Sequence, residues 1–346
     1  MKRSLVLIVA VLAGCTRGQT CTFPSGGGTA KIAAECLDGT LLGVDGDALI
    51  AYQLFNVPGP GTSAFRLDTR VGTRTTLTSD VYARPRPIVA NGELYFLACD
   101  NTPTSATCRF QAVPTAGGPA RTIVELSPEQ APGGLINGFA VDDASIYWIG
   151  SAVWSAPLAG GTGTQLADAH GDEKLVAVDA TGLYAASTVC PGAFEKISLD
   201  GSTRTPIINE SIGSVAARDG VVYWMEPTSP PENGGCSSGG GGSGGGCGGP
   251  EFGSLRSWSA DAGVQTVQTS IDGFGALVLD RSLVWTVGAV GPHCQSPNLN
   301  GIVQLVDGAP MTLVTSGDEG LFGSLVTDGL NLYGITPASI WRVPFR

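Results

Sequence analysis

Residues Phe139 to Asp168 read FAVDDASIYWIGSAVWSAPLAGGTGTQLAD, and this stretch decides the fold because it contains one complete structural repeat. Four short runs of β-favouring residues (FAV, IYWI, VWSAPL and GTQLA) are separated by the turn-forming pairs Asp142-Asp143, Gly150-Ser151 and Gly160-Gly161. Four strands in so short a segment predict a small antiparallel meander, in which each strand pairs with the next.

The same pattern recurs along the whole chain. A strand ends in Asp or Asn, a tight turn follows, and the next strand carries one or two aromatic residues. The seven turn residues are Asp45, Asn91, Asp142, Asp179, Asp219, Asp280 and Asp328. Their spacing, 37 to 61 residues, is typical of four-stranded β-propeller blades. The sequence therefore predicts an all-β, seven-bladed β-propeller with four antiparallel strands per blade.

The two ends of the chain complement each other. The last repeat stops at Arg346 after three strands, whereas residues 27–45 align with residues 160–179 of the complete repeat. Residues from about Gly28 to Cys36 therefore correspond to a fourth, outer strand. We expect this strand to complete the last blade and close the ring, because closure removes an exposed sheet edge. The alternative is an open array of sheets, but such arrays usually carry polar capping repeats and this chain shows none.

The first fifteen residues, MKRSLVLIVAVLAGC, have the form of a secretory signal, with two basic residues, an apolar run and small residues before Cys15. The apolar run is too short to span a bilayer as a mature helix. Its end, Leu12-Ala13-Gly14-Cys15, resembles the lipobox of bacterial lipoproteins. That resemblance implies removal of residues 1–14 and acylation of Cys15 with chains such as palmitate. It also implies an outer-membrane location, because Thr16 stands where Asp would favour inner-membrane retention. An ordinary cleaved signal with an unrelated cysteine is the alternative.

The chain is acidic, with 30 acidic and 19 basic side chains and a formal net charge of −11. Such a surface repels phosphate backbones and anionic headgroups, so we expect no nucleic-acid binding and attachment to the membrane through the acyl chains alone. Residues 15–27 form a lipidated lead-in, and residues 28–346 form one propeller domain because blades must stack on their neighbours. We expect a monomer, with residues 232–250, rich in Gly and Ser, as a flexible insertion.

When Cys15 is set aside, eight of the nine cysteines remain, an even number that can pair as disulfides. Paired cysteines are typical of proteins in an oxidising compartment. Cys99 and Cys108 flank a hairpin turn and are expected to face each other. The other six are paired by position alone, which leaves other pairings open: Cys21 with Cys36, Cys236 with Cys247, and Cys190 with Cys294. A metal site at His293 with nearby cysteines would lack the short paired spacing of zinc modules.

Loop lengths predict which face of the ring is used. With the strands of a blade named a to d from the axis outward, the b–c and d–a connections leave one face and the a–b and c–d connections leave the other. The long insertions all fall between strands b and c, at residues 54–63, 99–108, 188–192, 226–253 and 288–300. A rigid scaffold with long loops on one side is a common arrangement for binding.

Carboxylates in the d–a connections belong to that same predicted face. They are Glu129, Asp172, Glu173, Asp318 and Glu319. Together they could attract a cation such as Ca²⁺ or a basic partner. The alternative is that they are solvated charges that maintain solubility.

The sequence offers few groups for catalysis. His170 and His293 are the only histidines, and both fall in predicted loops. The pattern G-x-S-x-G around Ser237 and Ser243 lies inside the Gly-rich tract, without the strand and helix of a nucleophile elbow. The recurring Asp is expected to cap its own a–b turn rather than to form a calcium-binding ring as in calcium-dependent propeller hydrolases. We therefore expect neither an enzyme nor a cofactor.

Two families share features with these repeats. The strands IYWIG and VYWME, followed by a strand ending in L-x-G-G or L-D-G, resemble the YWTD-type repeats of receptor ectodomains, although no copy completes YWTD and those propellers differ in blade number. The chain is more similar to the secreted propeller lipoproteins of Gram-negative bacteria, especially the Gly-rich, Asp-rich type of myxobacteria. This resemblance implies fold and location more than activity.

From these observations we expect a non-catalytic binding or scaffold protein. It would recognise a protein or polysaccharide partner through the face that carries the long loops. The alternative is a metal-dependent propeller hydrolase or lyase with its site at the mouth of the central channel.

Overall fold

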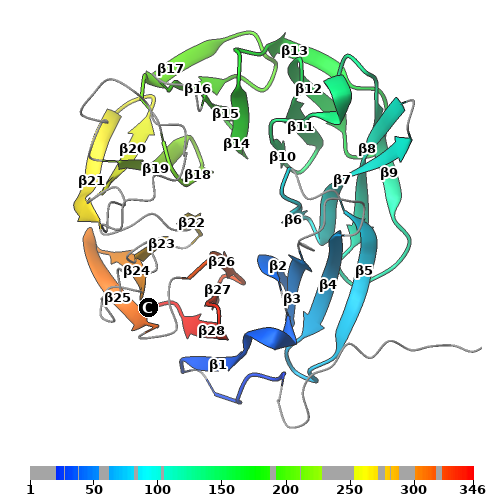
Figure 1. The fold of residues 1–346 in the computed structure, drawn as a ribbon. Helices are drawn as coiled ribbons and strands as arrows, with labels where there is room; N and C mark the ends of the chain where they lie inside the picture. Colours follow the sequence, from blue (N-terminus) through cyan, green and yellow to red (C-terminus); the bar gives the residue numbers. More distant parts are fainter. Residues whose placement is uncertain are drawn as a thin grey trace, which may run out of the picture.

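The computed structural model describes residues 21–26, 28–37, 39–53, 62–81, 85–102, 105–187, 192–210, 212–227, 253–271, 277–280, 282–287, 301–316 and 322–346. Seven four-stranded antiparallel sheets are arranged as a ring around a common axis (Figure 1). The protein is therefore a seven-bladed β-propeller, as the repeats predict. Within the described part of the chain, no helix has the length and apolar character of a membrane span.

The blades are numbered in chain order, starting with the blade that contains β2. The strands of each blade are given in the order a to d, from the axis outward. Blade 1 contains β2 (Thr40–Asp45), β3 (Ala48–Gln53), β4 (Thr62–Asp68) and β5 (Arg74–Val81). Blade 2 contains β6 (Ile88–Ala90), β7 (Glu93–Thr102), β8 (Ser105–Pro114) and β9 (Arg121–Leu126). Blade 3 contains β10 (Phe139–Val141), β11 (Ser145–Ile149), β12 (Ala152–Pro157) and β13 (Thr164–Asp168). Blade 4 contains β14 (Glu173–Asp179), β15 (Gly182–Ser187), β16 (Phe194–Ile197) and β17 (Arg204–Ile208).

The remaining blades follow the same order. Blade 5 contains β18 (Val215–Arg218), β19 (Val221–Pro227), β20 (Gly253–Ser259) and β21 (Gly263–Ile271). Blade 6 contains β22 (Leu277–Leu279), β23 (Leu283–Val287), β24 (Gly301–Val306) and β25 (Ala309–Thr315). Blade 7 contains β26 (Ser324–Thr327), β27 (Asn331–Ile335), β28 (Ser339–Pro344) and, from the other end of the chain, β1 (Ala30–Ala33). Two short 3₁₀ helices, η1 (Ala34–Cys36) and η2 (Pro132–Gly134), lie in d–a connections.

The ring is closed by β1, which pairs antiparallel with β28 (Figure 1). Lys31 lies opposite Trp341 and Ile32 lies opposite Ile340, so the predicted pairing of the two chain ends is confirmed. Successive side chains of a strand point to opposite faces. Ile32 is accordingly buried in the blade 7–blade 1 core, while the Lys31 ammonium lies 5.1 Å from the centroid of the Trp341 ring.

The residues before β1 are bound to the ring as well. Cys21 and Cys36 form a disulfide with 5.5 Å between their Cα atoms, as expected. The Phe23 ring packs on the Tyr333 ring at 5.8 Å between centroids, and the Arg342 guanidinium lies 5.1 Å from the centre of the Phe23 ring. The lead-in from residue 21 onward is thus a fixed part of the propeller.

The core lies between adjacent blades and is built largely from the strand-b aromatics. Trp148, Trp224 and Trp285 are almost completely buried, so these residues pack the contacts between blades. Phe194 of blade 4 contacts Trp224 of blade 5 with 5.6 Å between ring centroids. Among the described residues, the buried indole N–H groups of these tryptophans and of Trp154 have no hydrogen-bond partner. Their large apolar area therefore stabilises the blade contacts despite an unmade bond that costs about 1–3 kcal/mol each.

Three of the recurring Asp residues cap their own a–b turns, as predicted. The Asp142 carboxylate accepts hydrogen bonds from the amides of Ala144 (2.8 Å) and Ser145 (2.7 Å), and its other oxygen accepts one from the Tyr147 hydroxyl (2.9 Å). The same arrangement, with a tyrosine five positions after the Asp, occurs at Asp179 with Tyr184 and at Asp328 with Tyr333. Each turn is thereby tied to strand b.

The other turn residues differ from that prediction. Asp45 accepts a hydrogen bond from Thr115 of blade 2 (2.7 Å), and Asp280 accepts one from Thr327 of blade 7 (3.0 Å), so these carboxylates connect neighbouring blades. Asn91 and Asp219 adopt a left-handed backbone, with φ of 53° at both. Asn and Asp tolerate this conformation, which supplies the chain reversal through the backbone instead of a side-chain cap.

Buried tyrosine hydroxyls make the fold sensitive to alkali. Burial raises the pKa of Tyr95, Tyr147 and Tyr184 to about 12, and raises that of Tyr333 further. The folded pKa exceeds the unfolded value near 10, so this contribution to stability is complete below about pH 10 and is lost as pH rises toward 12.

We expect an absorbance titration at 295 nm to show these tyrosines ionising only together with the loss of the native circular dichroism signal. Reversible ionisation of all seven tyrosines near pH 10 in folded protein would contradict this assignment.

Candidate functional site

Hydrogen bonds between connections confirm that the ring has two different faces. The Ser151 hydroxyl, in a b–c turn, donates to the carbonyl oxygen of Glu129, in a d–a connection (2.6 Å). The Ser187 hydroxyl, at the end of strand b of blade 4, likewise donates to Asp172, which lies in the d–a connection between blades 3 and 4 (2.7 Å). On the other side, a c–d turn meets an a–b turn, because the Leu158 amide donates to the carbonyl oxygen of Ala144 (2.8 Å). We name these the long-connection face and the short-turn face.

Three of the predicted long connections join strand ends that lie at the long-connection face. Residues 54–61, 228–252 and 288–300 each join strand b to strand c, whereas the a–b turns contain only two or three residues. The conformations of these long segments lie outside the described residues. The segment 99–108 differs from expectation, because β7 and β8 continue pairing as far as Thr102 and Ser105. This connection is a β-hairpin that extends the blade rather than an irregular loop.

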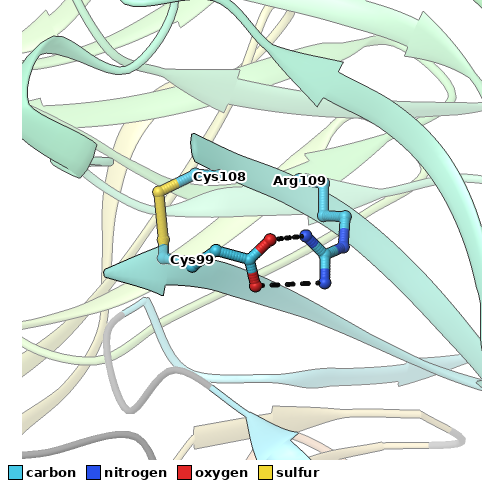
Figure 2. The surroundings of a disulfide bond; sticks show 4 residues. Cys99, Cys108 and Arg109 are labelled. Atoms are coloured by element: carbon cyan, nitrogen blue, oxygen red, sulfur yellow. Dashed lines mark hydrogen bonds and ion pairs between the residues drawn. A yellow bond between two sulfur atoms is a disulfide. The ribbon is translucent and has the colours of Figure 1, made fainter. Parts of the chain in front are cut away.

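The hairpin carries the second disulfide of the described residues. Figure 2 shows Cys99 on β7 joined to Cys108 on β8, with the Arg109 guanidinium beside it. The two cysteines are direct register partners with 4.1 Å between Cα atoms, so the predicted pair is confirmed. Arg109 forms an ion pair with Asp100 at 2.5 Å. Outside the described residues lie the other predicted cysteines, namely Cys15, Cys190, Cys236, Cys247 and Cys294.

Removing this disulfide should weaken the protein measurably without preventing folding. We expect the double substitution Cys99→Ser and Cys108→Ser to lower the free energy of unfolding by about 2–3 kcal/mol, because the short loop it closes gains freedom in the unfolded chain. Denaturant unfolding of the oxidised protein and of the double variant measures the difference. Equal midpoints would show that the bridge constrains nothing in the unfolded state.

A partly buried group of charges lies at the long-connection end of blade 4. Arg204 Nη1 lies 2.8 Å from Glu173 Oε1 and 2.5 Å from Glu195 Oε1. His170 Nδ1 lies 3.3 Å from Glu195 Oε1, and the His170 amide donates to Glu173 Oε2 at 3.1 Å. Arg204 Nη2 also donates to the carbonyl oxygen of Asp168 in blade 3. These side chains, the Arg204 cluster, connect strands a, c and d of blade 4 with the preceding blade.

The two carboxylates of the cluster have opposite pKa shifts. The Glu173 side chain is only 2% exposed, and burial opposes its ionisation. Hydrogen bonds from Arg204 and from the His170 amide outweigh this effect, so the pKa of Glu173 is lowered. Burial and the neighbouring Glu173 raise the pKa of Glu195. Arg204 therefore holds Glu173 as an ion, while Glu195 is the carboxylate that accepts a proton more readily.

A second group of charges lies at the long-connection end of the blade 4–blade 5 boundary. Arg256 Nε forms an ion pair with Glu226 Oε2 at 2.6 Å. Hydrogen bonding to Glu226 raises the pKa of Glu210, which lies in the d–a connection between the blades. We call these residues the Arg256 cluster. Each cluster sets two carboxylates against one guanidinium, so this part of the face has an excess of negative charge.

The structure brings only some of the predicted site residues together. Asp172 and Glu173 lie beside each other, but Glu173 is buried in the Arg204 cluster instead of lining an exposed ring. Glu129 is exposed in the β9–β10 connection, and Asp318 and Glu319 lie outside the described residues. Five charged residues of the clusters were missed by sequence reasoning: Glu195, Arg204, Glu210, Glu226 and Arg256. The sequence feature that could have indicated them is a pair of opposite charges on adjacent strands, in a chain that has few charged residues.

One arrangement of side chains has the composition of a metal site. The ligand atoms of His170, Glu173 and Glu195 all lie within 4.8 Å of one another. The Arg204 guanidinium, however, is hydrogen-bonded to both carboxylates. A divalent cation could be held there only by displacing this side chain, because the cation and the guanidinium require the same oxygens. In the present geometry, these carboxylates bind the Arg204 guanidinium instead of a metal ion.

Comparison with known proteins places the chain by fold. A scan against protein-family models finds no match. A search of curated proteins also finds no relative. Among solved structures, the chain is similar to the β-propeller domain of the Trilobed protease from Pyrococcus furiosus (TM-score 0.59, 9% identity, 88% of this chain and 95% of that one). That domain is described as having an open velcro topology, whereas here β1 and β28 pair.

Two further structures show how widely this fold is used. Virginiamycin B lyase from Staphylococcus aureus matches with a TM-score of 0.57 and 10% identity over 92% of this chain and 99% of that one. The WD40 domain of Pan2 from Neurospora crassa matches with a TM-score of 0.55 and 7% identity over 90% and 89%. At such identities the likeness concerns the fold alone. The chain is a seven-bladed β-propeller whose neighbours in structure include both enzymes and WD40 domains.

Proposed function

We propose that the protein is a lipid-anchored, extracytoplasmic propeller that binds a protein or polysaccharide partner through its long-connection face and performs no chemistry of its own. The observation that carries this proposal is the unequal length of the connections at the two faces. A rigid ring held by blade contacts, with long segments on one side only, has the organisation of a recognition scaffold.

The proposed location rests on the cysteines. Two disulfides, Cys21–Cys36 and Cys99–Cys108, are typical of proteins that mature in an oxidising compartment. The lipobox-like sequence before Cys15 supports attachment of the mature chain to the outer membrane through acyl groups.

The charge of the long-connection face bears on the nature of the partner. Both the Arg204 cluster and the Arg256 cluster contain more carboxylates than guanidinium groups, and the whole chain is acidic. Complementary charge speeds association and disfavours partners of like charge. A partner with a basic or uncharged contact surface is therefore favoured, and a nucleic acid is disfavoured.

A crosslinking pull-down from membranes of cells that make the protein tests the proposed face. We expect a variant in which residues 228–252 are replaced by a short Asn-Gly turn to lose crosslinked partners that the unaltered protein retains. Asp143→Ala, an exposed change in an a–b turn of the short-turn face, is the matched control and should leave them in place. Loss of the partners in the control alone would contradict the assignment of the binding face.

Metal content distinguishes this proposal from a metal-dependent hydrolase or lyase, for which the specific observation is the grouping of His170, Glu173 and Glu195. Purified protein should contain no stoichiometric divalent ion when measured by mass spectrometry of the elements. A tightly held ion that disappears in Glu195→Gln would favour the metal-dependent alternative and contradict a purely binding role.

A further inference from the structure

An open pocket lies on the short-turn face, at the boundary between blades 2 and 3. Its volume is about 430 Å³, and small-molecule sites usually have volumes of about 300–1,000 Å³. The a–b turns of both blades and the c–d turn of blade 3 contribute to its walls. Among the residues that line it are Asn91, Glu93, Tyr95, Arg121, Asp143 and Leu158. The pocket is therefore on the face opposite the long connections.

Hydrogen bonds hold the walls of the pocket in place, both within blade 2 and across the boundary. Arg121 Nε and Nη2 donate to the two carboxylate oxygens of Glu93, at 3.1 Å and 2.5 Å. Arg121 Nη1 donates to the carbonyl oxygen of Leu158 in blade 3 (2.6 Å). The Tyr95 hydroxyl donates to Glu93 Oε2 (3.0 Å). A ligand therefore meets side chains that are already ordered, which reduces the entropy lost on binding.

The hydrogen-bonding groups that these contacts leave over include both donors and acceptors. The bonds of Arg121 use three of its N–H groups, so one N–H remains on each Nη atom. The Arg121 side chain is 41% exposed, which makes these donors accessible to a ligand. Asp143 is exposed, and its carboxylate has no partner within the described part of the chain. Asn91 Nδ2 donates to the carbonyl oxygen of Asp142 (3.0 Å), which leaves the side-chain oxygen of Asn91 as a further acceptor.

The charges of the pocket determine which class of ligand fits it. The hydrogen bond from Arg121 lowers the pKa of Glu93, so at neutral pH this carboxylate is ionised and balances the guanidinium. An anionic ligand would be repelled by Asp143, and a cationic ligand would leave the remaining N–H groups of Arg121 without an acceptor. A hydroxyl group is neutral, donates one hydrogen bond and accepts others, so it can bind a carboxylate and a guanidinium together. Several adjacent hydroxyl groups, as on a sugar ring, satisfy both kinds of group.

We propose that the pocket between blades 2 and 3 binds a neutral monosaccharide, whose hydroxyl groups donate to the Asp143 carboxylate and accept from the Arg121 guanidinium. This site lies on the face opposite the one proposed for partner binding. It depends neither on that partner nor on the lipid anchor, and it gives the ring a small-molecule site in addition to its recognition surface.

Saturation-transfer NMR on the full protein tests the class of ligand. The neutral probes are the methyl glycosides of glucose, galactose and mannose, and the charged probes are glucosamine and glucuronate. We expect at least one neutral glycoside to bind several-fold more tightly than either charged sugar. Tighter binding of glucosamine or glucuronate would contradict a neutral ligand, and a lack of binding by every probe would overturn the site.

Two variants locate the binding. Asp143→Ala removes an exposed acceptor of the pocket and should weaken binding of the best neutral glycoside about tenfold, as expected for the loss of a hydrogen bond to a charged group. Asp47→Ala is the matched control, because Asp47 is an exposed residue of the a–b turn of blade 1, outside the pocket, and this variant should bind as the unaltered protein does.

The outcomes separate this site from the proposed recognition surface. Equal affinity in Asp143→Ala and the unaltered protein would place the sugar elsewhere and overturn the assignment of the pocket. Asp143→Ala should still retain the crosslinked partners of the long-connection face. Loss of sugar binding in Asp143→Ala with those partners retained is therefore the result that supports the pocket as a separate site.

Discussion

Replacing Ile32 by Ala should lower the free energy of unfolding by about 2–5 kcal/mol, even though Ile32 lies on a four-residue outer strand. Ile32 is 6% exposed and packs in the core between blades 7 and 1, opposite Ile340 of β28. The substitution removes buried apolar volume at the position where the two ends of the chain meet. Denaturant unfolding followed by circular dichroism measures the change.

The neighbouring residue provides the matched control. Lys31 lies on the same strand but points to the opposite face, where its ammonium approaches the Trp341 ring. Lys31→Ala should therefore cost no more than about 0.5–1 kcal/mol, the typical value of an exposed cation–π contact. If Ile32→Ala were as mild as Lys31→Ala, β1 would contribute little to the folded ring in solution and closure through this strand would be wrong.

Arg204→Met should be among the most damaging single substitutions, lowering the free energy of unfolding by about 3–5 kcal/mol at neutral pH. The reason is that Glu173, 2% exposed, would be left as a buried carboxylate without its cation. Methionine keeps most of the side-chain volume, so the effect reports the lost charge rather than a cavity. Paired unfolding curves of the unaltered protein and the variant measure it.

The loss of stability in Arg204→Met should depend on pH, being larger at neutral pH than at acidic pH. The folded pKa of Glu173 lies below its ordinary value of 4.5, so its ionised form stabilises the protein above that value and this contribution is lost as pH falls through the folded pKa. In Arg204→Met the uncompensated carboxyl becomes neutral on acidification. The difference in stability between the two proteins should therefore be large at pH 7 and small near about pH 4.

Two further variants separate this explanation from general damage. Glu173→Gln introduced into Arg204→Met should recover part of the loss at pH 7, because the buried charge is gone. Arg109→Met removes one partner of an ion pair whose Asp100 side chain is 59% exposed, and it should cost no more than about 1 kcal/mol. A pH-independent loss in Arg204→Met, unchanged by Glu173→Gln, would show that the guanidinium acts through packing alone.

The blades could be predicted from the sequence because their information is local. Turn residues such as Asp142 and short β-favouring strands with aromatic residues, such as IYWI, recur along the chain, and blade topology then assigns each connection to a face. Even the closing strand was predictable, since the last repeat lacks one strand and the first residues supply it. Cys99 and Cys108 were predictable for the same reason, as neighbours across one hairpin.

The charge clusters could not be predicted in the same way. Arg204 meets Glu173 across strands that are not neighbours in the sheet, and its contact with the Asp168 carbonyl depends on how blade 3 sits against blade 4. Such contacts are set by the packing of blades, which leaves no periodic trace in the sequence. Asp45 shows the same limit, because its partner Thr115 belongs to the next blade.

The pairing of β1 with β28 also determines when folding can finish. Of the strands of the ring, β1 is made first and its partner β28 is made last, and Arg342 bonds to Pro24 across a separation of 318 residues. Contacts of such long range form slowly and leave strand edges open in the meantime. The seventh blade can therefore form only after β28 has been made, and loss of either β1 or β28 would leave the same sheet incomplete.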